Sequence, residues 1–155
     1  MDIGLKKGFP ESNLSNLHPH AFCFDGVECA SLEGLLQSFK FEKVHIQREV
    51  CKLSGLEAKF RGKKRNKAWK RIQTLWWNGR SYNRDSREYQ ELLDQVYDAL
   101  AQQNAAFRKA LLATGNAALT HSLGKSDIRQ TVLTEREFCS RLEKIRTRLQ
   151  KEAGL

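Results

Sequence analysis

The chain has 155 residues, of which 40% are hydrophobic and 29% charged, a composition typical of a folded globular protein rather than a disordered one. No apolar run is long enough to span a bilayer, and the first residues lack the apolar stretch of a signal peptide, so we expect a single cytoplasmic domain over residues 1–155. Lys and Arg outnumber Asp and Glu by 27 to 18, and the net charge of +9 favours an anionic partner such as nucleic acid, a nucleotide or a phosphosugar.

The four cysteines form no C-x-x-C pair, which is typical of reduced thiols in a reducing compartment. The group of His18, His20, Cys23 and Cys29 matches no spacing of a structural zinc site. We therefore predict neither a metal nor a cofactor.

Residues 1–14 are predicted to be irregular, because Gly4, Gly8 and Pro10 are followed by turn-forming Ser and Asn residues. Asp25-Gly26 then lies between two apolar runs, which predicts a β-hairpin with a type I′ turn. We expect this hairpin to be the only sheet element of any length.

Helices are predicted for most of the remaining chain. Ser31 is a candidate N-cap for a helix whose apolar stripe has the spacing i, i+3, i+4, i+7. Further helices are expected at roughly 43–52, from the capping box Ser54/Glu57, over about 17 residues from Asp85/Glu88, at 105–115 ending on a glycine, and from the capping box Thr134/Glu137. The predicted fold class is mainly α: a compact multihelical domain with one small N-terminal β-hairpin.

Three polar residues, Glu33, Gln37 and Lys40, lie in one row of the first predicted helix, because seven residues fall only about 20° short of two turns. A solvated face is the commoner reason for such a row. Gly34 argues against it, since a glycine inside a helix costs about 1 kcal/mol relative to alanine and indicates close packing. A carboxylate and a lysine on one rigid wall are also a usable acid and nucleophile.

Several segments together resemble a known family. These are Leu14-Ser15-Asn16-Leu17, the pattern Ser31-x-Glu33-x3-Gln37-x2-Lys40-Phe41, Trp69 in a basic stretch, LLATGNAAL at 111–119, and Asp127 before the closing helix. They are similar to the NADAR family, also called YbiA-like, whose signature contains S-N-F and S-x-E-H-Y-F-Q-A-Q-K-F. The resemblance covers about residues 15–150 and implies a YbiA-like fold.

An N-glycosidase activity is what the resemblance implies: cleavage of the bond between a ribose C1 and a base amine. Its known substrate classes are ADP-ribosylated guanine in nucleic acid and ribosylamino-pyrimidine phosphates of riboflavin synthesis. Glu33, Lys40 and Asp127 match the family's catalytic glutamate, active-site lysine and second carboxylate. Residues matching its substrate-binding positions are Ser15, Asn16, Gln37 and Trp69. An unprotonated lysine could exchange with the base amine and hold the ring-opened sugar as a Schiff base.

The sequence also departs from the family pattern. Gly34 replaces the family's histidine, Leu35-Leu36 replaces its tyrosine-phenylalanine, and IRQTVLTEREF replaces the glycine-rich stretch after the aspartate. The segment WNGRSYNRDSREYQ resembles an insertion after Trp77. Substrate identity is therefore not transferred from the family.

The stretch KFRGKKRNKAWKR, residues 59–71, holds eight cations and no acid. Such a run can be a solvated surface, but cations interleaved with aromatic residues are also typical of nucleic-acid contacts. We expect Trp69 to stack on the ribose or base, and cations such as Lys67 and Arg71 to hold a pyrophosphate or nucleic-acid backbone. His121 is assigned to the substrate-binding side, although a structural role is commoner for a lone histidine. The alternative to an enzyme is a non-catalytic basic module that binds nucleic acid.

Overall fold

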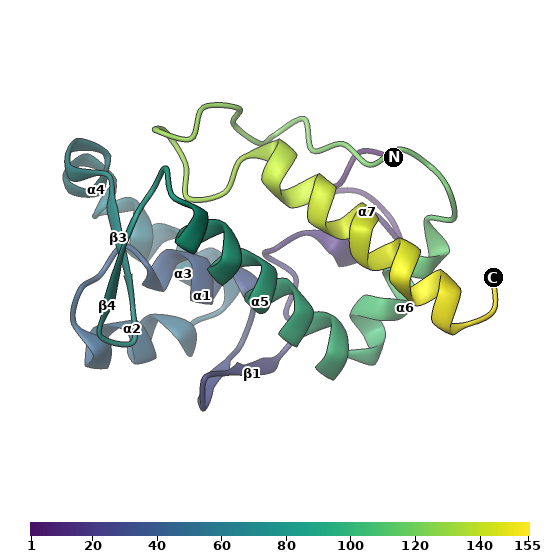
Figure 1. Ribbon diagram of the computed structural model, residues 1–155, viewed down its shortest axis with the longest axis horizontal. Helices are drawn as coiled ribbons and strands as arrows, with labels where there is room; N and C mark the ends of the chain where they lie inside the picture. Colours follow the sequence, from purple (N-terminus) through teal and green to yellow (C-terminus); the bar gives the residue numbers. More distant parts are fainter.

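A computed structural model describes the whole chain, residues 1–155, and contains seven α-helices and two small antiparallel hairpins. α5 crosses the middle of the molecule and α7 runs beside it, while α1 to α4 and the second hairpin lie at one end and α6 at the other (Figure 1). The predicted mainly α fold is confirmed. The helices are α1 Leu32–Ser38, α2 Val44–Cys51, α3 Gly55–Lys63, α4 Asn66–Ile72, α5 Arg87–Gln103, α6 Ala105–Ala113 and α7 Glu135–Glu152. None of these helices is both long and apolar enough to cross a membrane.

The first hairpin joins β1 Phe22–Phe24 to β2 Val27–Cys29 through the predicted Asp-Gly turn. Asp25 and Gly26 both have positive φ, 49° and 77°, as a type I′ turn requires. A short 3-10 helix, Ser12–Leu14, precedes it in the N-terminal segment that was predicted to be irregular.

A second hairpin corrects the expectation of a single one. β3 Thr74–Trp77 pairs with β4 Arg80–Asn83, and the turn residues Asn78 and Gly79 have φ of 49° and 89°. The segment after Trp77 that resembles an insertion is thus partly strand. Asn-Gly is the same type I′ turn signal as Asp-Gly, although here only the strand before it, Thr74–Trp77, is apolar and aromatic.

Side-chain caps fix where most helices begin. Thr134 and Glu137 form both halves of the predicted capping box at the start of α7. At α5 the expected Asp85/Glu88 cap is wrong by one residue: Ser86 is the N-cap, and its hydroxyl accepts from the backbone N–H of Tyr89 at 3.1 Å.

α1 packs against both α2 and α3. Its apolar side belongs to one hydrophobic cluster of 32 buried residues that reaches from Ile3 to Leu149. Gly34 faces the end of α2: a Cβ there would lie 3.2 Å from the carbonyl oxygen of Val50 and 3.3 Å from that of Cys51. The close packing predicted from this glycine is therefore present, and the family's histidine at this position would require the end of α2 to move by a few tenths of an ångström.

The long connection between α6 and α7, residues 114–134, returns over the outside of the molecule (Figure 1). The N-terminus fixes it in place. The Met1 ammonium donates to the Ala118 carbonyl at 2.7 Å, the Ile3 N–H donates to the Thr120 carbonyl at 2.8 Å, and the Asp2 carboxylate accepts from Ser122. A connection without helix or strand is thereby held in one position.

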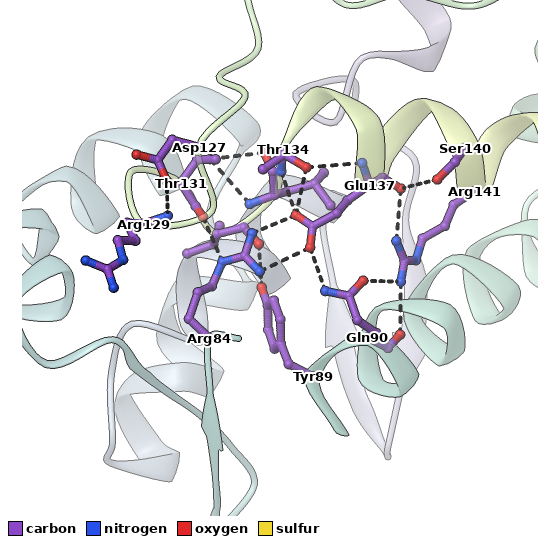
Figure 2. Close-up of polar contacts among 12 residues, drawn as sticks. Arg84, Tyr89, Gln90, Asp127, Arg129, Thr131, Thr134, Glu137, Ser140 and Arg141 are labelled. Carbon is purple, nitrogen blue, oxygen red and sulfur yellow. Dashed lines mark hydrogen bonds and ion pairs between the residues drawn. The ribbon is translucent and has the colours of Figure 1, made fainter. Parts of the chain in front are cut away.

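A buried polar network joins β4 and α5 to the start of α7 (Figure 2). The Arg84 guanidinium binds both carboxylate oxygens of Glu137, at 2.6 and 3.1 Å, and also donates to the Thr131 carbonyl. Gln90 donates to the same carboxylate at 2.6 Å. Burial alone would raise the pKa of Glu137, but these hydrogen bonds outweigh burial and the net pKa lies below its ordinary value.

Candidate functional site

The predicted polar row of α1 is present, although the helix is shorter than expected. α1 ends at Ser38, and Lys40 lies in the following turn, where its N–H donates to the Gln37 carbonyl at 3.1 Å. Gln37 and Lys40 are only 7% and 5% exposed, and Glu33 is half-buried. The row is therefore not a solvated face.

Glu33 is anchored by its backbone and by one side chain. Its N–H donates to the Asn16 carbonyl at 3.0 Å, and its carboxylate accepts from the Gln37 amide at 2.8 Å. Burial raises the pKa of Glu33, against the opposing effects of the Gln37 hydrogen bond and of the charges on Lys40, Lys59 and His121. A carboxyl group with a raised pKa keeps its proton to a higher pH, so it is able to act as an acid.

Lys40 is shifted in the complementary direction. Burial lowers its pKa to about 8; the charge of Glu33 opposes this shift, and the charges of Lys70 and Lys125 add to it. Its amine donates to the Asn66 side-chain oxygen at 2.5 Å. A lysine with this pKa is partly neutral near physiological pH, and a neutral amine is a nucleophile.

Glu33 and Lys40 form no ion pair with each other: no nitrogen–oxygen distance between them is within 4.0 Å. Each is held instead by a neutral amide, Glu33 by Gln37 and Lys40 by Asn66. An acid and an amine that are near enough to influence each other's pKa, but not paired, remain available to a third molecule.

Gln37 is itself placed by a close helix contact. Its side-chain amide lies against Gly62 of α3, where a Cβ would be 1.8 Å from Oε1, the side-chain oxygen of Gln37. That oxygen is buried and has no hydrogen-bond partner. Only a glycine at position 62 leaves room for the Gln37 side chain to reach Glu33.

Two surface depressions, of about 450 and about 500 Å³, are lined by other residues, the first by α5, α6 and α7 and the second by the β1–β2 hairpin, α2 and α5. The unpaired acid and amine distinguish the cluster on α1, and we take it as the candidate active site.

The chain matches one known protein family over most of its length. The family model described as Bacteriophage protein GP30.3 matches residues 8–147. The chain belongs to the GP30.3 family. One relative is the "Uncharacterized 17.1 kDa protein in Gp30-rIII intergenic region" of Enterobacteria phage T4, which is 37% identical over 142 residues, covering 91% of this chain and 93% of the relative.

A solved structure is similar to this GP30.3 family chain over almost its full length. The NMR structure of the E. coli protein YbiA superposes with a TM-score of 0.65 and 20% identity, covering 97% of this chain and 83% of YbiA. The YbiA-like fold that the sequence predicts is thereby confirmed. At this identity the similarity concerns the fold.

The remaining residues assigned from the sequence lie at varying distances from this cluster. Asn16 belongs to it, because its carbonyl anchors Glu33 and its side chain accepts from the Tyr97 hydroxyl at 3.0 Å. Ser15 is buried, and its hydroxyl accepts from the Leu17 N–H at 3.2 Å within the same turn. The His121 ring contacts the Ile3 carbonyl at 2.8 Å through Nδ1, and its charge acts on Glu33.

Asp127 is exposed, and its carboxylate accepts from the Arg129 N–H at 2.9 Å (Figure 2). The side chain that accepts from the Lys40 amine is that of Asn66, and a catalytic role of Asp127 stays a prediction. One expected role needs correction. Trp69 is 1% exposed, which leaves neither face of its ring free for stacking on a base or ribose. Its indole N–H instead donates to the Asn66 oxygen at 3.3 Å.

Asn66 is the residue that sequence reasoning missed. Asn66 and Trp69 are three residues apart in the basic stretch, a spacing that places both on one face where the stretch is helical, as it is in α4. Nothing in the spacing, however, relates Asn66 to Lys40, 26 positions earlier. Lys67 and Arg71 lie on the same helix with exposed side chains.

Proposed function

We propose that this protein is an N-glycosidase that hydrolyses the C1–N bond between a ribose and a base amine, and that it removes ADP-ribose from ADP-ribosylated guanine in nucleic acid. The observation that carries the proposal is the pair of Glu33 and Lys40: a half-buried acid with a raised pKa near a buried amine whose pKa is lowered to about 8, the two not ion-paired. The YbiA-like fold and the resemblance of the Glu33–Phe41 segment to the NADAR signature support it.

The chemistry follows from these two protonation states. The ribose ring opens when its ring oxygen leaves C1 and takes up the proton of the base nitrogen, which gives an imine between C1 and that nitrogen. The neutral Lys40 amine adds to C1, and the C1–N bond to the base breaks as the base nitrogen takes up two protons, one from Glu33 and one from the Lys40 amine. The second proton of the Lys40 amine returns to Glu33, which leaves Lys40 joined to C1 as an imine. Water then hydrolyses the Lys40 imine, which frees the sugar aldehyde to close again and restores the amine. At pH 7, one unit below a pKa of about 8, about one tenth of the lysine is neutral.

The basic surface near the site favours a substrate carried on nucleic acid. Lys59, whose charge acts on Glu33, lies on α3 with Lys63, and Lys64 directly follows the helix; all three are exposed. Phe60 stands among them at 63% exposure. Exposed cations around an exposed aromatic ring fit a phosphate backbone and an unpaired base, whereas a small ribosylamino-pyrimidine phosphate needs only one or two of these charges.

Turnover is tested by mass spectrometry of the purified protein with ADP-ribosylated DNA, RNA and nucleotides and with ribosylamine phosphates. We expect release of ADP-ribose from guanine, abolished by Glu33→Gln and by Lys40→Ala. The matched controls are Glu42→Gln and Lys43→Ala, which change exposed residues a few positions away and should leave turnover intact. Release from ribosylamine phosphates alone would establish the small-molecule alternative. Salt-sensitive DNA binding without any turnover would leave a non-catalytic module.

The covalent step has its own test. Borohydride added during turnover should reduce the imine and add the sugar mass to the peptide that contains Lys40, and not to the peptide of any exposed lysine. A clean negative with an active enzyme would replace the Schiff base by direct attack of water, with Glu33 as the acid.

The nucleic-acid surface is tested by charge reversal. Lys63→Glu/Lys64→Glu should weaken binding to single-stranded DNA and reduce the salt dependence of binding, because two phosphate contacts are lost. Lys144→Glu/Lys151→Glu makes the same change in net charge on α7, whose C-terminal half lies at the other end of the molecule from α3 (Figure 1). Equal loss in both variants would mean that net charge alone drives binding, which contradicts a specific surface.

A further inference from the structure

Asn66 lies at the start of α4, and two side chains donate to its side-chain oxygen. The Lys40 amine donates to Oδ1 at 2.5 Å, and the Trp69 indole N–H donates to the same atom at 3.3 Å. Lys40 is 5% and Trp69 1% exposed, and Asn66 between them is half-buried. The oxygen has two lone pairs, and the two donors occupy both.

The donors determine which way the amide points. An indole nitrogen can only donate, so Trp69 requires an oxygen and not an NH₂ group at its side of Asn66. The Trp69 hydrogen bond therefore keeps Oδ1, and not Nδ2, turned toward Lys40. Trp69 in turn has a fixed position, because it is part of the hydrophobic core.

A neutral amide suits a nucleophilic lysine better than a carboxylate does. A neutral amine has two N–H groups and one lone pair, so it can donate one N–H to Asn66 while its lone pair points elsewhere. A carboxylate in the same place would pair with the ammonium form and hold the proton on Lys40. The charged groups that act on Lys40 come from other positions: Glu33 on α1, Lys70 on α4 and Lys125 in the α6–α7 connection.

We propose that Asn66 is the positioning residue of this site, holding the Lys40 amine by one N–H so that its lone pair is directed at the substrate carbon, and that Trp69 fixes the orientation of the Asn66 amide. The proposal deepens the N-glycosidase function and rests on the role assigned there to Lys40. It also gives the buried Trp69 a function that does not require contact with substrate.

The first test measures Lys40 without any substrate. Folded protein is labelled with trace acetic anhydride over a range of pH, and the acetylation of each lysine is followed by mass spectrometry, with exposed Lys43 as the internal reference. Asn66→Asp should move the labelling midpoint of Lys40 upward by about one pH unit or more, because a carboxylate stabilises the ammonium form. The midpoint of Lys43 should not change. An unchanged Lys40 midpoint overturns the proposal.

The second test measures turnover of ADP-ribosylated guanine. Asn66→Leu keeps the branched shape of the side chain but removes the acceptor, and should reduce kcat at least about tenfold with little change in KM. Trp69→Phe removes the indole N–H and makes the ring smaller but leaves Asn66 in place. It should lower kcat less than Asn66→Leu does. Thermal unfolding of each variant identifies the temperature range in which it is folded, and rates are compared within that range. Unchanged kcat in folded Asn66→Leu overturns the proposal.

The two tests separate failure of the positioning role from failure of the proposed function. If the wild-type protein turns over no ADP-ribosylated substrate, the labelling experiment still measures whether Asn66 controls Lys40, and a shift in Asn66→Asp supports that contact. If turnover is found and falls in Asn66→Asp while the Lys40 midpoint stays in place, Asn66 acts through another group and the proposal is wrong.

Discussion

Two buried clusters of charged residues in this protein are built in opposite ways. In the network around Arg84 and Glu137 each charge meets its opposite: the guanidinium binds both carboxylate oxygens, and Gln90 and the Thr134 cap occupy the rest of the carboxylate. In the cluster on α1, Glu33 and Lys40 have opposite charges but are held apart, each by a neutral amide.

The pKa values follow from this difference. Glu137 and Glu33 are both carboxylates that burial would make more basic, yet the pKa of Glu137 ends below its ordinary value and that of Glu33 above it. The number of donors separates them, since Glu137 accepts from Arg84, Gln90 and Thr134, whereas Glu33 accepts from Gln37 alone. Removal of one partner from a satisfied buried pair is costly to the fold, and unpaired buried charges are retained where they have a use.

The largest effects on turnover are expected when each charge of the cluster around α1 is removed. Glu33→Gln and Lys40→Ala should each lower turnover by a factor of about 10² to 10⁴, because each removes an acid or a nucleophile. The free energy of unfolding of Glu33→Gln should be unchanged or slightly higher, since the amide is easier to bury and its oxygen can still accept from Gln37. Kinetics and urea unfolding of the same preparations measure both. A large loss of stability would make the cluster a structural one.

The network around Arg84 should respond in the reverse manner. Glu137→Ala leaves the guanidinium of Arg84, 1% exposed, without its carboxylate and removes the N3 side chain of the α7 capping box, so the free energy of unfolding should fall by about 3 to 5 kcal/mol. Arg87→Ala is the matched control, because the Arg87–Glu91 pair is 87% and 56% exposed and should contribute no more than about 0.5 kcal/mol. Equal effects in the two variants, measured by urea unfolding, would contradict the assigned difference.

A contact can be predicted from the sequence when its residues lie close together along the chain. The capping box of Thr134 and Glu137 and the Asp25-Gly26 turn are local patterns, and both are confirmed, because the residues involved are at most three positions apart. The second hairpin has an equally local pattern, Asn78-Gly79, and was missed because the segment after Trp77 was interpreted as an insertion.

The sites themselves depend on long-range contacts, which spacing does not reveal. The row of Glu33, Gln37 and Lys40 lies within eight residues and was predicted, whereas Asn66 reaches Lys40 from a different helix. Arg84 is 53 positions from Glu137 and gave no signal at all. The burial of Trp69 likewise results from the assembled core, so a tryptophan among cations is no proof of an exposed stacking surface.

The lowered pKa of Lys40 makes the free energy of unfolding depend on pH. Lys40 has an ordinary pKa of 10.5 in the unfolded chain and about 8 in the folded protein, so below pH 8 its burial as an ammonium is a cost that disappears between pH 8 and 10.5. At pH 7, Lys40→Met should be more stable than the wild type by about 1 to 3 kcal/mol, and this difference should shrink as the pH rises to 10.5. Unfolding in urea across this range measures it. Lys43→Met, at an exposed position, should show no such trend, and a constant difference for Lys40→Met would contradict the lowered pKa.

The smallest expected effect concerns how Gln37 is held against Glu33. In Gly62→Ala, the new Cβ would lie 1.8 Å from the Gln37 side-chain oxygen, so the side chain must rotate away and its hydrogen bond to Glu33 is lost. Turnover should fall about threefold to tenfold, the value of one such hydrogen bond, while alanine in a helix offsets part of the cost in stability by about 1 kcal/mol. Gly8→Ala, with no atom within 4 Å of its new Cβ, should leave turnover unchanged.

In a Gln37→Ala background the Gly62→Ala change should have no further effect on turnover, because both substitutions remove the same contact. Additive losses would mean that Gly62 acts on the site through something other than Gln37.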